Sequence, residues 1–491
     1  MKRGIGTIFL VLFSFLLASA QNQDSTEVYK KKVLEATEVD FLMSLYKQNG
    51  ENSAVGGGLG TEKLDNITPT IVISLPLNDD DVLTIDAGIS AYSSASSSNI
   101  NPFNNTGASR GSDDDDDEYE NEHEDDDDDY GPANSQPTGT PWLASSGASK
   151  SDVLASVHLT YSHSSDDRNF IWSSNVAVSN EYDYTSVGFG GNLTKLFNEK
   201  NTEFGLGGMV YLDQWRPIYP TELHEYDLYG EDFLSNGYFD GVDVLDQNGS
   251  VSTDYHPVDF SSVDKRGRNS FSMSLFISQI LSERLQAALF FDVVYQQGLL
   301  STPYHRIYFA DKANYYIGEK SYIPVYTTPQ NLGVYQLADD IERLPSSRLK
   351  IPIGARLNYY LNETFVLRSY YRYYTDDWGL QAHTANFDLP IRLNPKLSIT
   401  PSYRYYTQSE VKYYAPYETH LSTETYYTSD PDLAKFNSNQ YSVALNYNDI
   451  FNDFHISKFA LKNANLKYSH YDRSDGLKAD IVSMGFKFIF Q

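Results

Sequence analysis

The sequence predicts an all-β fold, a transmembrane antiparallel up-and-down β-barrel of about 16 strands with long extracellular loops. Candidate strands between Thr37 and Phe490 alternate apolar and small polar side chains with period two. Every long polar insertion follows an odd-numbered strand, and even-numbered strands end in tight turns. Membrane barrels are built this way, because chain excursions of any size are tolerated on only one side of the bilayer.

The chain begins with features of a secreted protein. Lys2 and Arg3 precede an apolar run from Ile8 to Leu17, and small residues follow it. This pattern is typical of a signal peptide, which we expect to comprise residues 1–20. The apolar run is too short for a membrane helix, and no later stretch reaches the ~20 apolar residues that such a helix needs.

The remainder is expected to form one large unit. Residues 21–36 are charged and lack alternation, so we expect a short periplasmic N-terminal segment there, followed by the barrel over residues 37–491. The 40 tyrosines and 26 phenylalanines suit strands with a lipid-facing side and aromatic residues at the headgroups. The absence of cysteine excludes disulfides and thiolate metal sites. A net charge of −29 argues against nucleic acid as a partner. Outer-membrane lipids are the expected surroundings, because the alternating strands present one apolar face.

The alternation is clearest in four segments. In each, bulky apolar residues occupy one face, and the other carries mostly Ser, Thr, Gly or Asn, which suits a wet lumen better than a dry sandwich core. The segments are Val153 to Ser162, Phe271 to Ser278, Lys396 to Tyr406 and Val482 to Phe490.

Turns and loops follow strand parity. Turn-forming residues end the even-numbered strands, for example at Asn78, Asn362 and Asn394. If the N terminus is periplasmic, the five long loops all lie outside the cell. They are Lys47 to Asn66, Ser93 to Lys150, Trp215 to Arg266, Leu299 to Pro345 and Ser409 to Ser438.

The second of these loops carries an acidic tract. Residues 113–129 hold fourteen carboxylates in seventeen positions, which repel one another, so we expect a disordered acidic loop over residues 93–150. The alternative is that its many carboxylate oxygens bind Ca²⁺ or Mg²⁺ weakly, without a preformed binding site.

Period-two parity places a basic cluster on the lumen side of the barrel wall. Arg356 and Arg368 flank one tight turn almost symmetrically, so they should be near cross-strand neighbours. An arginine facing lipid would cost about 2–4 kcal/mol, which supports the inward assignment. The cluster is either a binding site for an anionic solute or a structural ladder neutralised by inward carboxylates such as Asp388, Asp292 or Glu203. Its members are Arg356, Arg368, Arg372 and Arg404.

A second candidate site is an aromatic rim beyond the strand ends. Aromatic side chains there are typical of an interfacial belt, and they also suit a docking surface for a partner. The residues predicted for partner binding are Trp378, His383, Tyr413, Tyr414 and Tyr417.

Several motifs resemble a large family of Gram-negative outer-membrane barrel proteins known only as a domain of unknown function. The resemblance covers most of the mature chain and implies a barrel without an established activity. Members are often encoded beside a small lipoprotein, a thioredoxin-like protein and a flavin transferase, which implies an envelope redox system as their context. The motifs are Gly56–Glu62, Tyr371–Gly379 with His383 and Thr384, Tyr403–Gln408, Tyr413–Tyr417 and Tyr427–Asp430.

We therefore predict a pore or transport channel for a small anionic solute in the outer membrane of a Gram-negative bacterium, with the N terminus in the periplasm. The alternative is a non-transporting envelope scaffold that binds a lipoprotein or another surface partner, in a redox-related system. We predict no enzyme, cofactor or metal site. A constellation of Ser156, His158 and Asn175 on adjacent strands is the weak signal for a third class, a hydrolase.

Overall fold

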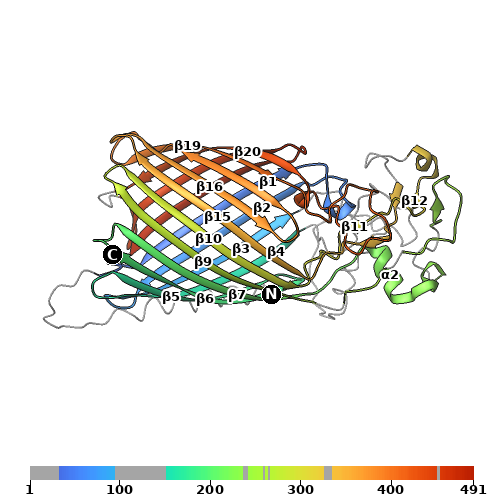
Figure 1. Cartoon of the computed structure of the whole chain (residues 1–491), viewed down its shortest axis with the longest axis horizontal. Helices are drawn as coiled ribbons and strands as arrows, with labels where there is room; N and C mark the ends of the chain where they lie inside the picture. Colours follow the sequence, from blue (N-terminus) through green and yellow to red (C-terminus); the bar gives the residue numbers. More distant parts are fainter. Residues whose placement is uncertain are drawn as a thin grey trace, which may run out of the picture.

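The computed structural model describes residues 32–93, 151–235, 242–257, 260–263, 266–325, 334–449 and 454–490. They form one closed antiparallel barrel with a folded extension at one end (Figure 1). The predicted signal peptide, most of the segment 21–36 and the acidic loop beyond residue 93 lie outside the described residues.

The barrel has the number of strands that the sequence predicts. Its sheet contains 18 strands, of which β18 (Ile391–Arg392) and β21 (His455–Ile456) have two residues each. The sixteen long strands are β1 (Glu38–Asn49), β2 (Leu64–Pro76), β3 (Asp81–Ser93), β4 (Ser151–Ser164), β5 (Phe170–Asn180), β6 (Tyr184–Phe197), β7 (Thr202–Trp215), β9 (Gly267–Ser282), β10 (Leu285–Gly298), β15 (Ser347–Tyr360), β16 (Val366–Asp376), β17 (Gln381–Asp388), β19 (Leu397–Gln408), β20 (Phe436–Asn448), β22 (Phe459–Arg473) and β23 (Lys478–Phe490).

The barrel closes between its first and last strands. β1 pairs with β23 antiparallel in an unbroken register from Glu38 opposite Ile489 to Asn49 opposite Lys478. At this seam the Lys487 ammonium lies 3.0 Å from the Glu38 carboxylate and 3.2 Å from that of Asp40. Closure leaves no long strand with an unpaired edge, which a bilayer requires because it supplies no hydrogen-bonding partners.

The two faces of the wall differ as predicted. On β4, Val153 is 51% exposed on the outside, whereas Ser156 and Thr160 occupy the alternate positions that face the lumen. None of the helices in the described ranges has the length and apolar character needed to cross a bilayer. Large apolar side chains are exposed all round the exterior, where lipid covers them in barrels of this kind. Examples are Phe41, Ile67, Val157, Phe189, Met273, Leu289, Ile353, Tyr441 and Phe486.

One end of the barrel, here called the turn end, has short connections stabilised by asparagine side chains. The Asn78 carboxamide oxygen accepts hydrogen bonds from the backbone N–H groups of Asp80 (2.8 Å) and Asp81 (2.9 Å). Asn362 and Asn394 accept equivalent pairs at two other turns. The same local geometry recurs because an Asn side chain can mimic a backbone turn.

The opposite end, the loop end, carries a folded structure that we call the loop cap, made from the described residues within 50–63, 216–266, 299–346 and 409–435. Figure 1 shows α2, β11 and β12 of the cap beyond the loop end of the barrel. Its elements are η1 (Ala54–Gly56), α2 (Thr221–Tyr229), η4 (Gly230–Ser235), β8 (Leu245–Asp246), β11 (Arg306–Ile307), β12 (Tyr315–Gly318), η5 (Lys320–Val325), β13 (Val334–Gln336), β14 (Asp340–Ile341) and η6 (Pro431–Leu433).

Most buried apolar clusters of the described chain lie in this cap, and one extends to Trp378 and to Ala382 of the barrel wall. Phe233 and Tyr255 pack edge to face with ring centroids 5.7 Å apart, and Leu223 is fully buried in a neighbouring cluster. A buried ion pair joins two cap segments, because Arg306 Nε donates to Glu222 Oε1 at 2.8 Å. The cap therefore has the packing of a small folded domain, while the lumen remains lined by polar side chains.

Candidate functional site

A cavity of about 650 Å³ opens into the barrel lumen at the predicted basic cluster. The four predicted arginines all line it, although they come from three different strands. The cavity is lined by Phe290, Asp292, Arg356, Asn358, Arg368, Ser369, Tyr370, Arg372, Asn386, Asp388 and Arg404.

Strand register explains how these residues meet. Arg368 on β16 lies opposite both Asn358 on β15 and Asp388 on β17. Arg404 on β19 lies opposite Asn386 on β17. The predicted proximity of Arg356 and Arg368 follows from the same register, since Arg356 lies opposite Tyr370, two residues beyond Arg368.

The guanidinium groups of this cluster lack ionic partners within the described structure. None of the four lies within 4.0 Å of a carboxylate there, whereas Arg348 on the same wall pairs with Asp376 at 2.5 Å. Asp388 instead accepts a hydrogen bond from the amide of Asn386 at 3.0 Å. With four arginines and two aspartates, Asp292 and Asp388, the cavity lining carries a formal charge of +2. Within the described lining, two of the four positive charges therefore have no matching carboxylate.

An aromatic wall that the sequence analysis missed borders the basic cluster. The Arg356 guanidinium lies 5.2 Å from the Phe290 ring centroid and 5.9 Å from that of Tyr370. Phe276 stacks on Phe290 at 5.9 Å with an interplanar angle of 13°. The sequence contained a signal for Phe276, because it interrupts the serine face of Phe271 to Ser278.

A smaller cavity of about 360 Å³ continues along this aromatic wall. It shares Phe290, Arg356 and Asn358 with the larger cavity and adds Phe276 and Glu203. The two cavities together present a cationic surface beside an apolar one, which can bind an anion and an attached ring or chain at the same time.

The predicted aromatic rim is partly buried. Trp378 is 3% exposed, and its indole N–H donates to the Ser347 carbonyl at 2.9 Å. Its ring packs edge to face with Tyr413, and its centroid lies 4.3 Å from the Arg348 guanidinium. These contacts give Trp378 a structural role at the base of the loop cap.

The other predicted rim residues do not form a single surface. Tyr417 packs on Tyr308 inside the cap, at 5.2 Å between ring centroids. His383 lies on the outer face of β17 and hydrogen-bonds to the Tyr371 hydroxyl at 2.7 Å. Tyr413 and Tyr414 line a surface cavity of about 490 Å³ together with Lys412, Ala415, His420, Glu424, Thr425 and Tyr426.

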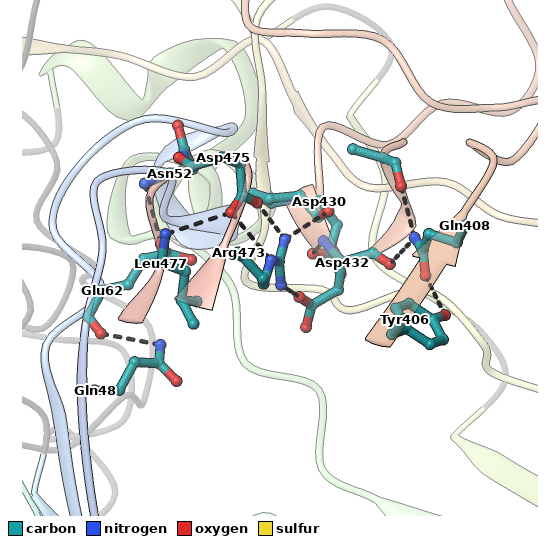
Figure 2. Close-up of polar contacts among 12 residues, drawn as sticks. Gln48, Asn52, Glu62, Tyr406, Gln408, Asp430, Asp432, Arg473, Asp475 and Leu477 are labelled. Carbon is teal, nitrogen blue, oxygen red and sulfur yellow. Dashed lines mark hydrogen bonds and ion pairs between the residues drawn. The ribbon is translucent and has the colours of Figure 1, made fainter. Parts of the chain in front are cut away.

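A polar network fastens the cap to the loop end of the barrel (Figure 2). Arg473 at the end of β22 binds Asp432 at 2.5 Å and also the Asp475 carboxylate, and its guanidinium lies 3.9 Å from the Phe436 ring centroid. The Gln408 amide, at the end of β19, donates to the Asp432 carbonyl at 2.9 Å. The loop containing Asp430 and Asp432 is therefore held over the strand ends.

The hydrolase constellation is not assembled. Ser156 lies opposite Ser179 and His158 lies opposite Ala177, whereas Asn175 lies opposite Thr160. Within the described residues, no hydrogen bond joins Ser156, His158 and Asn175, and the Asn175 carboxamide oxygen has no hydrogen-bond partner. Metal-ligating side chains meet instead in the loop cap, at His305, Glu342 and Asp430.

Comparison with solved structures finds outer-membrane proteins at low similarity. A bacterial polysaccharide outer membrane secretin shares 9% identity over 94% of this chain and 100% of its own, with a TM-score of 0.39. Outer membrane protein opdK from Pseudomonas aeruginosa shares 7% identity over 93% and 98%, with a TM-score of 0.34. A deltaS2 mutant of the TodX monoaromatic hydrocarbon channel shares 8% identity over 93% and 90%, also with a TM-score of 0.34.

The family of the chain is established by its sequence. No curated protein matches it. The model of the family described as "Protein of unknown function (DUF3570)" matches residues 8–472, nearly the whole chain, and this match confirms the predicted resemblance. The chain belongs to the DUF3570 family.

Proposed function

We propose that this protein is an outer-membrane pore that passes a small anionic solute, and that Arg356, Arg368, Arg372 and Arg404 form its binding site. The observation that supports this most directly is the unpaired basic cluster, whose guanidinium groups all remain accessible in a cavity of about 650 Å³. Unpaired arginines in a lumen are expected to concentrate anions and to lower the barrier to their passage. The protein supplies no chemical step in this proposal and acts without catalysis.

Conductance measurements in planar bilayers test the proposal. We expect the purified full-length protein to form channels whose reversal potential in a KCl gradient favours chloride. The double variant R368A/R372A should shift that potential toward the nonselective value, because it removes two of the four positive charges that face the cavity. R284A is the matched control, since Arg284 lies exposed in the turn between β9 and β10.

Two results would contradict the proposal. One is a folded barrel that conducts no current under any condition, and the other is selectivity that R368A/R372A and R284A leave equally unchanged. Folding of each variant is checked by its heat-dependent mobility in gels, so that loss of selectivity is separated from loss of the barrel.

A scaffold that binds a protein partner is the second candidate. The surface cavity of about 490 Å³ lined by Tyr413, Tyr414 and Tyr426 supports it, because tyrosines that are at least partly exposed can anchor protein contacts. We expect such a partner, for instance an envelope lipoprotein, to crosslink to a photoreactive residue placed at Tyr426 in native membranes. Absence of any stoichiometric crosslinked product would remove this candidate.

A further inference from the structure

His305 and Glu342 are brought side by side by a short β-ribbon in the loop cap. β11 pairs with β14 so that Arg306 lies opposite Ile341, which places the preceding His305 beside the following Glu342. The Glu342 backbone N–H donates to the His305 carbonyl at 2.9 Å and extends this pairing. Both side chains are largely buried, with side-chain exposures of 12% for His305 and 2% for Glu342.

Asp430 reaches the same point from a different loop. It precedes η6 in the segment between β19 and β20, and its Oδ1 accepts from the Asp432 N–H at 2.9 Å. Reciprocal backbone hydrogen bonds between Arg343 and Tyr427, of 3.0 and 2.7 Å, join the two loops nearby. One ligand atom each from His305, Glu342 and Asp430 lies within 4.8 Å of the other two.

The side chains are held in a way that leaves donor atoms available. Glu342 Oε2 accepts from the Thr302 N–H at 2.6 Å, and Oε1 accepts from the Thr428 hydroxyl at 2.5 Å. Each carboxylate oxygen keeps a second lone pair, and hydrogen bonds of this kind commonly orient the carboxylate ligands of metals. His305 Nδ1 is shielded from solvent without a hydrogen-bond partner in the described structure, at 3.7 Å from Glu342 Oε1.

We propose that His305, Glu342 and Asp430 form a binding site for a divalent transition-metal ion such as Zn²⁺, which links the two loops of the cap. The imidazole favours Zn²⁺ and its neighbours in the first transition series over Ca²⁺ and Mg²⁺, which bind oxygen ligands. One imidazole and two carboxylates complete three positions of a tetrahedron, and water fills the fourth. Metal–ligand bonds of about 2 Å require the three side chains to move slightly toward one another.

The site departs from the sequence prediction that no metal is bound. The ligand atoms of His305, Glu342 and Asp430 lie within 4.8 Å of one another, so two carboxylates share one partly buried position. A bound dication would compensate the negative charge of the two carboxylates. Metal binding would therefore fix the position of the β19–β20 loop, which carries Asp430.

Zinc binding to the full-length protein in detergent tests the proposal. After removal of metals with a chelator, Zn²⁺ is titrated by calorimetry in excess Mg²⁺, which occupies the loose oxygen sites of the acidic tract. We expect one tight site per chain, weakened more than about 100-fold in H305A, since even outer partners of metal ligands are worth 10–100-fold. H470A is the matched control, because His470 lies on the barrel exterior beside Asp480.

The absorption spectrum of bound Co²⁺ is a second, independent measurement. Co²⁺ bound at this site should give visible absorption typical of four-coordinate nitrogen and oxygen ligation, and this absorption should be lost in D430N, which preserves the shape of the side chain. If H305A does not fold, D430N alone decides the outcome. Equal Zn²⁺ affinity in the wild type, H305A and D430N, or absence of a tight site in the wild type, would overturn the proposal without bearing on anion passage.

Discussion

The Arg356 guanidinium lies over the ring of Phe290, 5.2 Å from its centroid, on the neighbouring strands β15 and β10 of the lumen wall. A cation is thus placed against an aromatic face at the border of the two cavities. The pair therefore presents a positive charge and an apolar surface side by side.

We expect aromatic carboxylates to interrupt channel current more effectively than aliphatic ones of equal charge. Contacts between aromatic rings are worth about 0.5–1.5 kcal/mol, so benzoate should block at concentrations about 2–10-fold lower than acetate. F290L should reduce this difference. Block measured in single channels checks the prediction, and F291L is the control, because Phe291 lies on the outer face of the same strand. Equal block by both acids in the wild type would refute it.

The loop cap should lose stability as the pH rises from about 4 to 7. Burial raises the pKa of Asp339 from 3.8 to about 7, so the folded cap holds this proton more tightly than the open cap. Stability is then greatest below about pH 4 and falls until pH 7, by up to about 4 kcal/mol for this group. The raised pKa values of Glu62, to about 7, and Asp430, to about 6, act in the same direction.

Hydrogen exchange of cap amides, corrected for intrinsic rates, measures this dependence. D339N should flatten it, because Asn stays neutral and retains an oxygen to accept from the Phe309 N–H, now at 2.8 Å. An unchanged slope in D339N would exclude Asp339 as its source. Amides in the barrel strands serve as the internal reference.

Removing Arg306 should open the cap and spare the barrel. The Arg306 side chain is 4% exposed, and its partner Glu222 also accepts from the Ala338 N–H. Deleting one member of a buried ion pair costs about 3–5 kcal/mol, so R306A should make the cap sensitive to protease. The barrel should keep its heat-dependent gel mobility. K312A, an exposed change in the same cap, should behave as the wild type.

The loop cap should face the outside of the cell. Because the chain contains no cysteine, single cysteines report on exposure without background. L421C, in the cap, should react with a membrane-impermeant maleimide on intact cells, whereas E283C, in a tight turn, should react only after the outer membrane is permeabilised. The reverse pattern would place the N-terminal end of β1 outside.

The barrel and its basic cluster could be predicted because both follow from period-two alternation. Parity alone assigns Arg356, Arg368, Arg372 and Arg404 to one face, and tight turns limit how far their strands can shift. Phe290 could not be predicted in this way. The alternation identifies the lumen face by its polar residues, and a phenylalanine on that face is an exception to the pattern. Its proposed role depends on Arg356, which lies 66 residues further along the chain. In the barrel, Arg356 lies opposite Ala288, two residues before Phe290.

The loop cap offers no such pattern. β11 and β14 have two residues each, too few to show a period, and their pairing depends on tertiary packing. His305, Glu342 and Asp430 lie far apart in the sequence and match no spacing motif. Only the fold brings them together, so sequence reasoning had no means of grouping them.

The pairing of β1 with β23 has a consequence for biogenesis. Glu38 can contact Lys487 only after nearly the entire chain has been synthesised, so β1 has no β23 partner during export. In that interval β1 exposes a row of free amide and carbonyl groups that could recruit foreign strands. We therefore expect a chaperone or insertion machine to shield this edge of β1 until β23 pairs with it.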